Sequence, residues 1–433
     1  MIEKFDAVVV GAGPAGTTVA LVLAQAGVKV ALVERGETPG AKNVSGGALY
    51  YSQVLHKLVP DFWQEAPVER YITRHTTTCL TPTASLSLDF KDTSFGQPPY
   101  NGFTLLRAKF DRWYAQKAQQ AGALLIPETL VDDLLWADGR VVGIKTRRDE
   151  GELYADVVIV ADGANSLLAE KAGLTKKTSP ADFAVAAKEL LALPSRTIEE
   201  RFNLAPDEGV ASEFIGACTE GIQGGGFLYT NKASISIGVV ANLNHLRERK
   251  LSIAELLDSF KQHPLLKELL KDATTKEYSG HLLPEGGLKA MPRLYGDGIL
   301  LAGDAAGLVY STGLVLEGMN FAIASGAAAA EAVKQARQAG DFSKKSLAYY
   351  ETLLNSSFVL KDIKNFRHTT GFLAKPRLYE LYPALACGVA HRLFRAEGQP
   401  RKRWLALVRD EMRGRISLLR VIKDIIRAWR ALL

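Results

Sequence analysis

The sequence predicts an α/β fold with a Rossmann-like dinucleotide-binding domain, an inserted and mainly antiparallel β-sheet domain, and a helical C-terminal region. Residues 8–36 carry the pattern of strand, glycine-rich turn, helix and second strand. Residues 181–285 change to the alternating pattern that is typical of strands. At residues 298–307 an apolar strand with a glycine turn returns. The dinucleotide-binding domain is therefore expected to be built from both ends of the chain around an insert.

The composition is that of an ordinary globular protein with more than one domain. The chain has 433 residues, of which 47% are hydrophobic and 23% are charged. Cys79, Cys218 and Cys387 lie far apart, so we expect no iron–sulfur cluster, disulfide framework or metal site within the chain. The first strand follows Met1 without a signal-peptide pattern, and no apolar run reaches the roughly 18 residues of a membrane span. We therefore expect a cytoplasmic protein.

The glycine-rich turn after the first strand predicts a dinucleotide site. Gly11 has the position of the tight turn, Gly13 that of the close approach to a pyrophosphate, and Gly16 that of the helix–strand contact. The helix that begins near Ala15 would direct its positive end at the phosphates. Glu34, about 20 residues later, suits a carboxylate that accepts from a ribose hydroxyl. The candidate residues of this segment are Gly11, Gly13, Pro14, Ala15, Gly16, Glu34 and Arg35.

The segments between these two ends alternate between helix and strand patterns. In chain order they predict a helix at 104–122, two or three strands at 123–146, a buried strand at 153–166, a hairpin at 224–240, a helix of small residues at 320–333, and helices from about 345 onward.

The late glycine turn favours FAD over NAD. The apolar strand at 299–302 delivers Gly303 and Asp304 to a helix N-terminus, where a carboxylate can accept hydrogen bonds from a polyol. NAD has no ribityl chain for such a residue to hold. Together with Arg107 and the segment ADGANS at 161–166, this pair resembles the glutathione-reductase-type FAD proteins, in the branch that includes aromatic hydroxylases and geranylgeranyl reductases.

That resemblance implies further cofactor contacts. Asp304 would hold the ribityl chain, Arg107 would lie near the diphosphate or ribityl, and Val131 would offer backbone contacts to the adenine region. The remaining candidates are Asp162, Gly163, Gly303 and the pair Gly313 and Leu314, whose backbone would face the flavin ring. Taken alone, Asp304 could instead be an ordinary helix cap.

Three further segments narrow the resemblance. GAKNVSGGALY at 40–50, GGGFLYT at 224–230 and the run at 282–307 resemble the electron-transfer flavoprotein:quinone oxidoreductase family, most closely its FixC-type form. Family members take electrons from an electron-transfer flavoprotein and pass them through FAD to membrane quinone. In the fused form a ferredoxin-like domain carries a 4Fe–4S cluster. Because this sequence lacks four clustered cysteines, the cluster is expected on a separate partner subunit, or is absent.

The resemblance also implies the partners. They are the alpha and beta subunits of an electron-transfer flavoprotein, a ferredoxin-like subunit and quinone. In the FixC-type setting the chain resembles the quinone-reducing arm of an electron-bifurcating complex, in which NADH oxidation also drives reduction of a ferredoxin or flavodoxin.

The segment GGGFLYT is the candidate quinone site. Without side chains, Gly224 and Gly225 let a flat ring lie against the backbone, and by resemblance they contact the quinone. Phe227 and Tyr229 are candidate ring neighbours, while a hairpin strand with glycine bulges is the alternative. No nucleophile–base pair is visible, so no catalytic side chain is assigned. The residues that can influence flavin or proton movement are His281, Glu285 and Lys42.

The end of the chain predicts a basic amphipathic helix, which suits an anionic membrane surface. Docking of its apolar face on the body or on a partner subunit is the alternative, and both stay open. The apolar stripe is Leu418, Ile422, Ile425, Trp429 and Leu433, and the basic side is Arg420, Lys423, Arg427 and Arg430. The net charge is +6, but no nucleic-acid-binding module accompanies it, so nucleic acid is not an expected partner.

The expected function is that of an FAD-containing subunit, peripheral on the cytoplasmic face of the membrane, that links an electron-transfer flavoprotein to quinone. A geranylgeranyl-type prenyl-lipid reductase and a membrane-docking assembly subunit with structural FAD are the alternatives. The expected domains are an FAD-binding domain at 1–75, 100–175 and 286–345, a quinone or substrate β-sheet domain at 76–99 and 176–285, and the helical C-terminal region at 346–433, in contact with the membrane or a partner.

Overall fold

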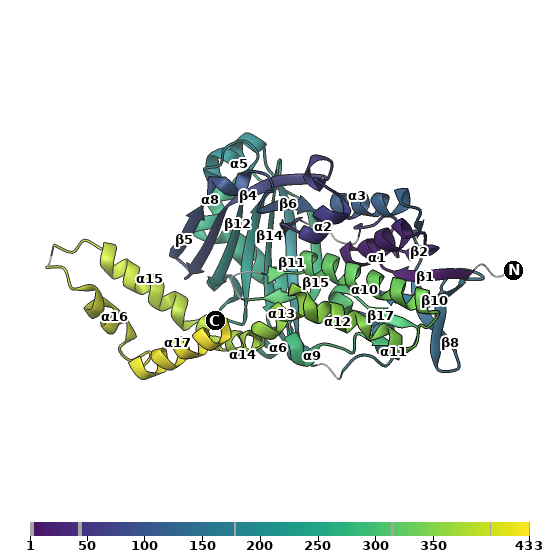
Figure 1. Cartoon of the computed structure of the whole chain (residues 1–433). Helices are drawn as coiled ribbons and strands as arrows, with labels where there is room; N and C mark the ends of the chain where they lie inside the picture. The colour runs from purple at the N-terminus through teal and green to yellow at the C-terminus, as the bar shows by residue number, and fades with distance from the viewer. Residues whose placement is uncertain (1–3, 42–45, 177–178, 313–315, 399, 433) are drawn as a thin grey trace.

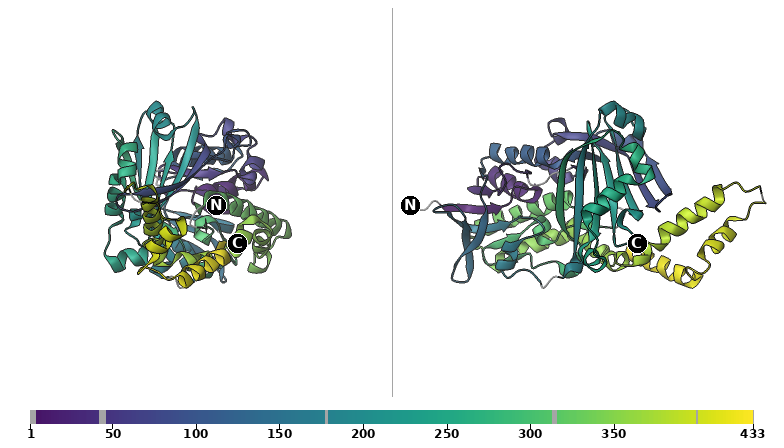
Figure 2. Two further views of the ribbon diagram at one scale, coloured as in Figure 1. Left: turned by 90° about the vertical axis from the view of Figure 1, so that its left-hand side faces the viewer. Right: turned by 180° about the vertical axis from the view of Figure 1, so that it is seen from behind.

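The computed structural model describes residues 4–41, 46–176, 179–312, 316–398 and 400–432. Two large sheets form the body of the molecule, and a helical arm extends from one end (Figure 1). Figure 2 shows from behind that the N-terminus and the arm lie at opposite ends of the molecule.

The first sheet has eight strands and a parallel centre. Val8 and Val9 of β1 (Lys4–Val10) are fully buried, as is Val158 of β10 (Glu152–Val160). Such continuous apolar runs suit central strands that are covered on both faces. β1 pairs in parallel with β10 and β2, β10 with β17, and β2 with β7. The other strands are β2 (Val30–Val33), β7 (Leu124–Ile126), β8 (Val131–Ala137), β9 (Arg140–Thr146), β16 (Tyr295–Gly296) and β17 (Ile299–Leu301).

The helices on this sheet pack closely because small residues line their contacts. α1 (Pro14–Gln25) packs against α10 (Met319–Ala339) and α3 (Arg107–Gln120). A Cβ added at Gly326 of α10 would lie 2.3 Å from the backbone oxygen of Ala15. The run of small residues therefore lets α10 approach the start of α1.

The second sheet has nine strands in the order β15–β11–β14–β13–β12–β4–β6–β3, with β5 paired to β4. Its described pairs are antiparallel except for β12 with β4. The strands are β3 (Gly46–Tyr50), β4 (Val68–Leu80), β5 (Ser85–Lys91), β6 (Gly102–Leu106), β11 (Phe183–Ala192), β12 (Glu208–Gly216), β13 (Gly224–Thr230), β14 (Ser234–Asn242) and β15 (Thr274–Pro284).

The two faces of the second sheet have different surroundings. On β11, Ala187 and Leu191 belong to an apolar cluster with Leu257 of α7 (Ile253–Gln262). Because side chains alternate along a strand, Lys188 points to the opposite face. Its charge interacts with Arg107 and Asp304, so this face lies toward the first sheet.

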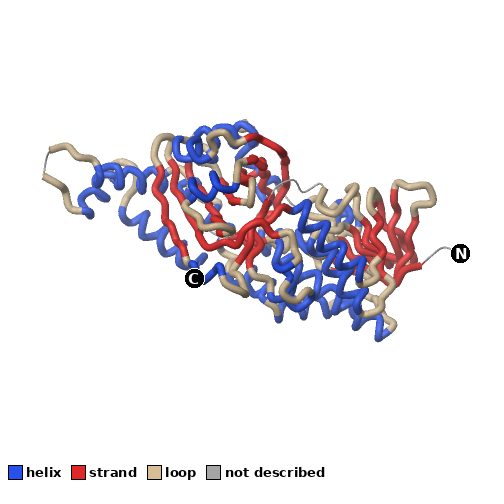
Figure 3. Tube along the Cα trace, turned by 90° about the horizontal axis from the view of Figure 1, so that it is seen from above, coloured by secondary structure: helices blue, strands red, loops and turns tan. Residues whose placement is uncertain are grey.

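The C-terminal region is helical, and α15–α17 form the arm, which projects beyond the second sheet in the view from above (Figure 3). The helices of the whole C-terminal region are α11 (Lys344–Leu347), α12 (Tyr349–Ser356), α13 (Phe358–Asn365), α14 (Thr369–Leu373), α15 (Leu381–Phe394), α16 (Trp404–Met412) and α17 (Leu418–Leu432). The shorter elements elsewhere are α2 (Gln53–Leu58), α4 (Leu167–Lys171), α5 (Ser195–Phe202), α6 (Leu243–Arg249), α8 (Pro264–Leu269), α9 (Gly287–Ala290), β18 (Tyr310–Ser311) and β19 (Leu316–Glu317).

α17 packs on neighbouring parts of the C-terminal region through a polar residue and leaves its apolar side exposed. Asp424 is 4% exposed and accepts hydrogen bonds from Arg377 and from the Tyr382 hydroxyl, each at 2.8 Å. Ile425 and Trp429 are 61% and 63% exposed. Docking of the apolar face on the chain's own body, one of the alternatives from the sequence, is therefore wrong. Leu433, the last member of the predicted stripe, lies outside the described residues.

The predicted fold class is confirmed, but the pairing of the second sheet was not visible in the sequence. α3 follows β6 as the pattern at 104–122 predicts, and β13 and β14 form the predicted hairpin. β3, β6 and the first part of β4 pair within the second sheet, although their residues lie in ranges that the sequence assigned to the FAD-binding domain. Local patterns carry no signal for pairing between strands this far apart in the chain.

Candidate functional site

The carboxyl ends of β1, β10 and β17 meet at one edge of the first sheet and bring glycine turns together. A Cβ at Gly11, where φ is 101°, would lie 2.3 Å from the backbone oxygen of Ala161. A Cβ at Gly16 would lie 1.9 Å from the backbone oxygen of Gly11. At Gly13 the nearest atom would be the Arg107 guanidinium at 3.9 Å. Packing thus requires Gly11 and Gly16, while the space beside Gly13 leaves the N-terminus of α1 open to a ligand.

The late glycine turn packs against the same helix end. Gly303 begins the short helical turn Gly303–Ala306, and a Cβ there would lie 2.9 Å from the Ala15 Cβ. Pro14 occupies the first turn of α1, where its missing N–H costs no hydrogen bond. The two glycine segments therefore form one cradle, although nearly 300 residues separate them in the sequence.

Glu34 holds the glycine loop in place. Its carboxylate accepts hydrogen bonds from the backbone N–H of Ala12 at 3.0 Å and of Gly36 at 2.7 Å. The backbone N–H of Thr129 donates to the Glu34 carbonyl at 2.8 Å, which places the nearby start of β8, Val131, at the same edge. The ribose contact of Glu34 and the adenine contact of Val131 stay predictions.

Asp162 and Gly163 follow β10, beside the glycine loop. Among the described residues, the buried Oδ1 of Asp162 has no hydrogen-bond partner. Burial raises the pKa of Asp162 to about 6, while the nearby Ser166 side chain and the charge of Arg35 oppose the rise. A buried acceptor without a donor fits a ligand that would supply one.

Asp304 lies beside two cations. Burial raises the pKa of its carboxyl, and the charges of Arg107 and Lys188 oppose this rise. Asp111 accepts hydrogen bonds from Arg107 at 2.9 and 2.8 Å, which fixes the guanidinium. Burial and the charge of Arg107 lower the pKa of Lys188 to about 8. Lys188 was not predicted from the sequence, because its place here depends on the register of the second sheet.

The residues of this cradle fit FAD. The open helix end suits a diphosphate, the Asp304 carboxylate suits ribityl hydroxyls, and Asp162 offers an unpaired acceptor. The predicted contacts of Gly313 and Leu314 lie outside the described residues.

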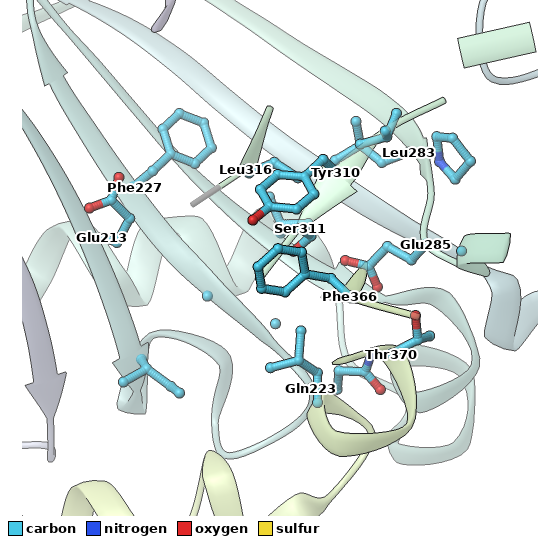
Figure 4. Close-up of a pocket in the computed structure, with 18 of the residues that line it drawn as sticks. Glu213, Gln223, Phe227, Leu283, Glu285, Tyr310, Ser311, Leu316, Phe366 and Thr370 are labelled. Atoms are coloured by element: carbon cyan, nitrogen blue, oxygen red, sulfur yellow. The ribbon is translucent and has the colours of Figure 1, made fainter. Parts of the chain in front are cut away.

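A cavity of about 190 Å³ lies between the second sheet and the helices that follow α12 (Figure 4). The predicted quinone residues Gly224, Gly225, Phe227 and Tyr229 all line it. Val309, Tyr310 and Ser311, which follow the Asp304 turn, line another side. One continuous segment, residues 303–311, therefore contributes to both the cofactor cradle and the cavity wall.

The glycines of this wall also have a packing reason. A Cβ at Gly224 would lie 2.1 Å from the Val240 oxygen, and one at Gly225 would lie 2.8 Å from the Phe214 oxygen. The Phe227 ring covers Gly238, where a Cβ would lie 2.4 Å from the ring, and stacks on Tyr229 with centroids 5.2 Å apart. Strand packing alone thus accounts for Gly224 and Gly225. The separate observation that favours a ligand is that both residues line a cavity.

Carboxyl groups face the cavity from two sides, and one of them, Glu213, was not predicted from the sequence. Burial raises the pKa of Glu213, on β12, to about 7. Burial, followed by the charge of Glu213, raises the pKa of both Tyr50 and Tyr229. Glu285, after β15, has a buried Oε2 without a partner among the described residues, and burial raises its pKa to about 7. The available signal was a carboxylate in the middle of a strand whose neighbouring residues are mostly small or apolar.

His281 lies on the same face as Lys188, because it pairs with Ala186 of β11. Burial lowers its pKa to about 4, and the charges of Lys188, Arg107 and Arg35 contribute. The ring is therefore neutral at pH 7. Lys42, the other residue considered with it, lies outside the described residues.

The described part of the chain contains no group of three or more His, Cys, Asp or Glu side chains arranged to hold a metal ion. Within the same ranges, no helix combines the length and the apolar character needed to cross a bilayer.

Comparison with known sequences identifies relatives over the whole chain. Residues 369–433 match the C-terminal domain of the ETF-QO/FixC family, and residues 5–195 match the pyridine nucleotide-disulphide oxidoreductase family. Protein FixC of Escherichia coli strain K12 is 43% identical over 425 residues, which cover 95% of this chain and 98% of FixC. The probable electron transfer flavoprotein-quinone oxidoreductase YdiS of the same strain is 40% identical over 430 residues, 99% of each chain.

Solved structures share the fold at lower identity. A geranylgeranyl bacteriochlorophyll reductase-like protein from Thermoplasma acidophilum has a TM-score of 0.74 and 20% identity, and the match covers 99% of this chain and 100% of that protein. The FAD-dependent halogenase CndH has a TM-score of 0.66 and 20% identity, covering 100% of this chain and 91% of the halogenase. These likenesses show a fold of FAD-dependent oxidoreductases. With the sequence relatives, they show that the chain is an oxidoreductase that belongs to the ETF-QO/FixC family.

Proposed function

We propose that the chain is an FAD-containing subunit that receives electrons from an electron-transfer flavoprotein and passes them to quinone. The observation that carries this proposal is that one short segment of the chain contributes to both the cofactor cradle and the wall of the cavity. The segment after Asp304 forms one cavity wall, and the GGGFLYT strand forms another. A bound flavin would supply the chemistry that joins one-electron carriers to a two-electron acceptor.

The chain's own residues would bind and orient the two partners of the transfer. The N-terminus of α1 and Arg107 would hold the diphosphate, and Asp304 would hold the ribityl hydroxyls. Tyr310 is held in one wall of the cavity, because its ring packs on Phe321 of α10 at 5.5 Å and on Phe366 at 5.2 Å. Such a wall would hold a flat ring and exclude water from the transfer.

The exposed apolar side of α17 supports a peripheral position on an anionic membrane. Quinone is lipid-soluble, so part of a quinone reductase must reach the bilayer. The apolar side of α17 is flanked by exposed basic residues, among them Arg420, Lys423 and Arg427. Interfacial helices combine these two features.

The partners in this proposal are the alpha and beta subunits of an electron-transfer flavoprotein and a ferredoxin-like subunit that carries a 4Fe–4S cluster. The name of the relative YdiS supports the link to an electron-transfer flavoprotein and to quinone. An electron-bifurcating complex that oxidises NADH and reduces both quinone and a ferredoxin or flavodoxin is the proposed setting.

Reconstitution with the partners tests the proposal. The FAD-loaded chain is purified with the flavoprotein and ferredoxin-like subunits, and NADH-dependent reduction of a short-chain quinone is measured. We expect the rate to require both partner types. A rate that is indifferent to them would contradict the relay, and saturation of a prenyl chain in place of quinone reduction would favour a prenyl-lipid reductase.

A further inference from the structure

The cavity carries two carboxyl groups that electron transfer alone does not use. Glu213 lies in the middle of β12, opposite Phe227 of β13, and no ion pair or hydrogen bond to its carboxyl is found within the described ranges. Figure 4 shows Glu213 and Glu285 on different sides of the cavity, with the Tyr310 and Phe366 rings between them. Buried acids without a salt-bridge partner are costly, so their presence on a cavity wall suggests a role.

The surroundings of Glu213 favour its protonated form. Its titratable neighbours are Tyr229 of β13 and Tyr50 of β3, and Tyr50 in turn is near Glu317 of β19 and stacks on His75 of β4 at 6.1 Å. Burial lowers the pKa of His75, so this ring is neutral at pH 7. The neighbours therefore supply no positive charge that would favour a carboxylate, and burial raises the pKa of Glu213 to about 7.

The surroundings of Glu285 have the same effect. The backbone N–H of Glu285 donates to the Asp182 carbonyl at 2.7 Å. Its carboxyl lies near Tyr379: burial raises the pKa of Tyr379, and the charge of Glu285 adds a smaller rise. The Asn242 amide partly opposes the effect of burial on the pKa of Glu285. Arg367 also lines the cavity, but it is exposed to solvent and donates to the Lys364 carbonyl. Glu285 thus lies on the cavity wall where a proton can be held near pH 7.

We propose that Glu213 and Glu285 are the proton donors for reduction of a quinone in this cavity. The inference rests on the proposed function, and it names side chains for a reaction to which the family resemblance assigned none. A quinone has two carbonyl oxygens, and carboxyl groups on two sides of the cavity match two oxygens on two sides of a ring.

In this reaction the quinone gains two electrons from the reduced cofactor, and each carbonyl oxygen gains one proton. Two carboxyl O–H bonds break and two quinol O–H bonds form. The two carboxylates are then reprotonated from water, while the protons released by oxidation of the cofactor leave to water.

A comparison of two electron acceptors tests this proposal. The chemically reduced, FAD-loaded full chain is mixed with a short-chain ubiquinone or menaquinone analogue, or with ferricenium, which accepts one electron and no proton. Glu213→Gln and Glu285→Gln are measured from pH 5.5 to 9, with Glu277→Gln, an exposed residue of β15, as the matched control. The glutamine side chain keeps the shape of glutamate but has no acidic proton to transfer.

In the wild-type chain we expect the quinone rate to be constant below pH 7 and to fall above it, because the raised pKa values of about 7 leave the carboxyls protonated below that pH. Each glutamine variant should lose about 100-fold or more in quinone rate, the usual size of proton transfer by a positioned side chain. Ferricenium rates and the Glu277→Gln variant should match the wild type.

Unchanged quinone rates and pH profiles in both glutamine variants would overturn the proposal. If a glutamine variant also loses ferricenium reduction, the aspartate variant at that position is measured. A shift in the pH at which its quinone rate falls, relative to the wild type, supports the proposal. An unchanged pH dependence overturns it. A wild-type chain that reduces ferricenium but no quinone would instead contradict the proposed function, before any variant is compared.

Discussion

Asp304 is the residue on which the proposed cofactor cradle depends most. Its carboxylate lies beside the cradle's cations, Arg107 and Lys188, and it follows Gly303, which packs on α1. Without a ligand, burial works against its charge, so the hydroxyl groups of a bound cofactor would satisfy a group that is otherwise costly to bury.

Replacing Asp304 by alanine should therefore weaken FAD binding. A charge-assisted hydrogen bond is worth about 1.5–3 kcal/mol, so the dissociation constant should rise roughly 10- to 150-fold. Flavin fluorescence titration of the refilled apoprotein measures this change. Asp149→Ala, at an exposed aspartate after β9, serves as the control and should bind like the wild type. Equal affinity in both variants would remove Asp304 from the site.

Glu213 gives a second prediction, about stability and pH. Its pKa is raised from 4.5 to about 7 in the folded chain, so the unfolded chain loses this proton at lower pH. The carboxyl therefore destabilises the fold increasingly as the pH rises from about 4.5 to 7, and fully above that range. The Glu213→Gln variant lacks this penalty. Its free energy of unfolding should exceed that of the wild type by about 1–3 kcal/mol at pH 8 and by much less at pH 5.

Urea denaturation at the two pH values checks this difference, with Glu277→Gln as the exposed control. A stability difference between Glu213→Gln and the wild type that stays the same at pH 5 and pH 8 would show that Glu213 titrates normally in the folded chain.

Residues in loops with a fixed local geometry could be predicted from their spacing, whereas strand residues such as Lys188 and Glu213 could not. Gly11, Gly16 and Gly303 are required by contacts within short turns, and their spacing shows this. Lys188 and Glu213 lie at their sites because distant strands pair in one register. A shift of one residue would turn either side chain to the opposite face.

At the scale of elements, α17 has an inverted arrangement for a terminal helix. Helices of globular proteins usually bury their apolar side, but α17 presents it to solvent and docks through Asp424. The sequence predicted the amphipathic helix but left open which side would face the body. That choice depends on Arg377 and Tyr382, which come from segments about 40 residues earlier in the chain.

The exposed side of α17 should bind anionic vesicles. Replacing Ile425 and Trp429 together by glutamate removes apolar area and adds negative charge, so the vesicle-bound fraction should fall at least about tenfold. Co-sedimentation with vesicles of phosphatidylglycerol and phosphatidylcholine measures it. A chain with Leu124→Glu, at an exposed leucine of β7 in the first sheet, should still bind. Equal binding by both chains would assign this helix to a protein partner.

At the scale of the whole molecule, the cradle and the cavity join parts that come from all regions of the chain. The first sheet supplies the glycine loop and Asp162, and the second sheet supplies Lys188 and the GGGFLYT strand. The sequence predicted that both ends of the chain build the cofactor domain. It did not predict that β3 and β6 cross into the second sheet, because hydrogen bonding between remote strands leaves no periodic signal.

FAD should therefore stabilise both sheets together. A ligand that binds only the folded chain adds about 2.7 kcal/mol at a free concentration 100 times its dissociation constant. Removal of FAD should lower the midpoint of thermal unfolding, and hydrogen exchange should accelerate both at residues 11–16 and on β11 around Lys188. The reason is that the charge of Lys188 interacts with Asp304, the residue proposed to hold the ribityl chain. Faster exchange at the glycine loop with no change on β11 would mean that the second sheet does not contribute to cofactor binding, and the single cradle would have to be replaced by a site on the first sheet alone.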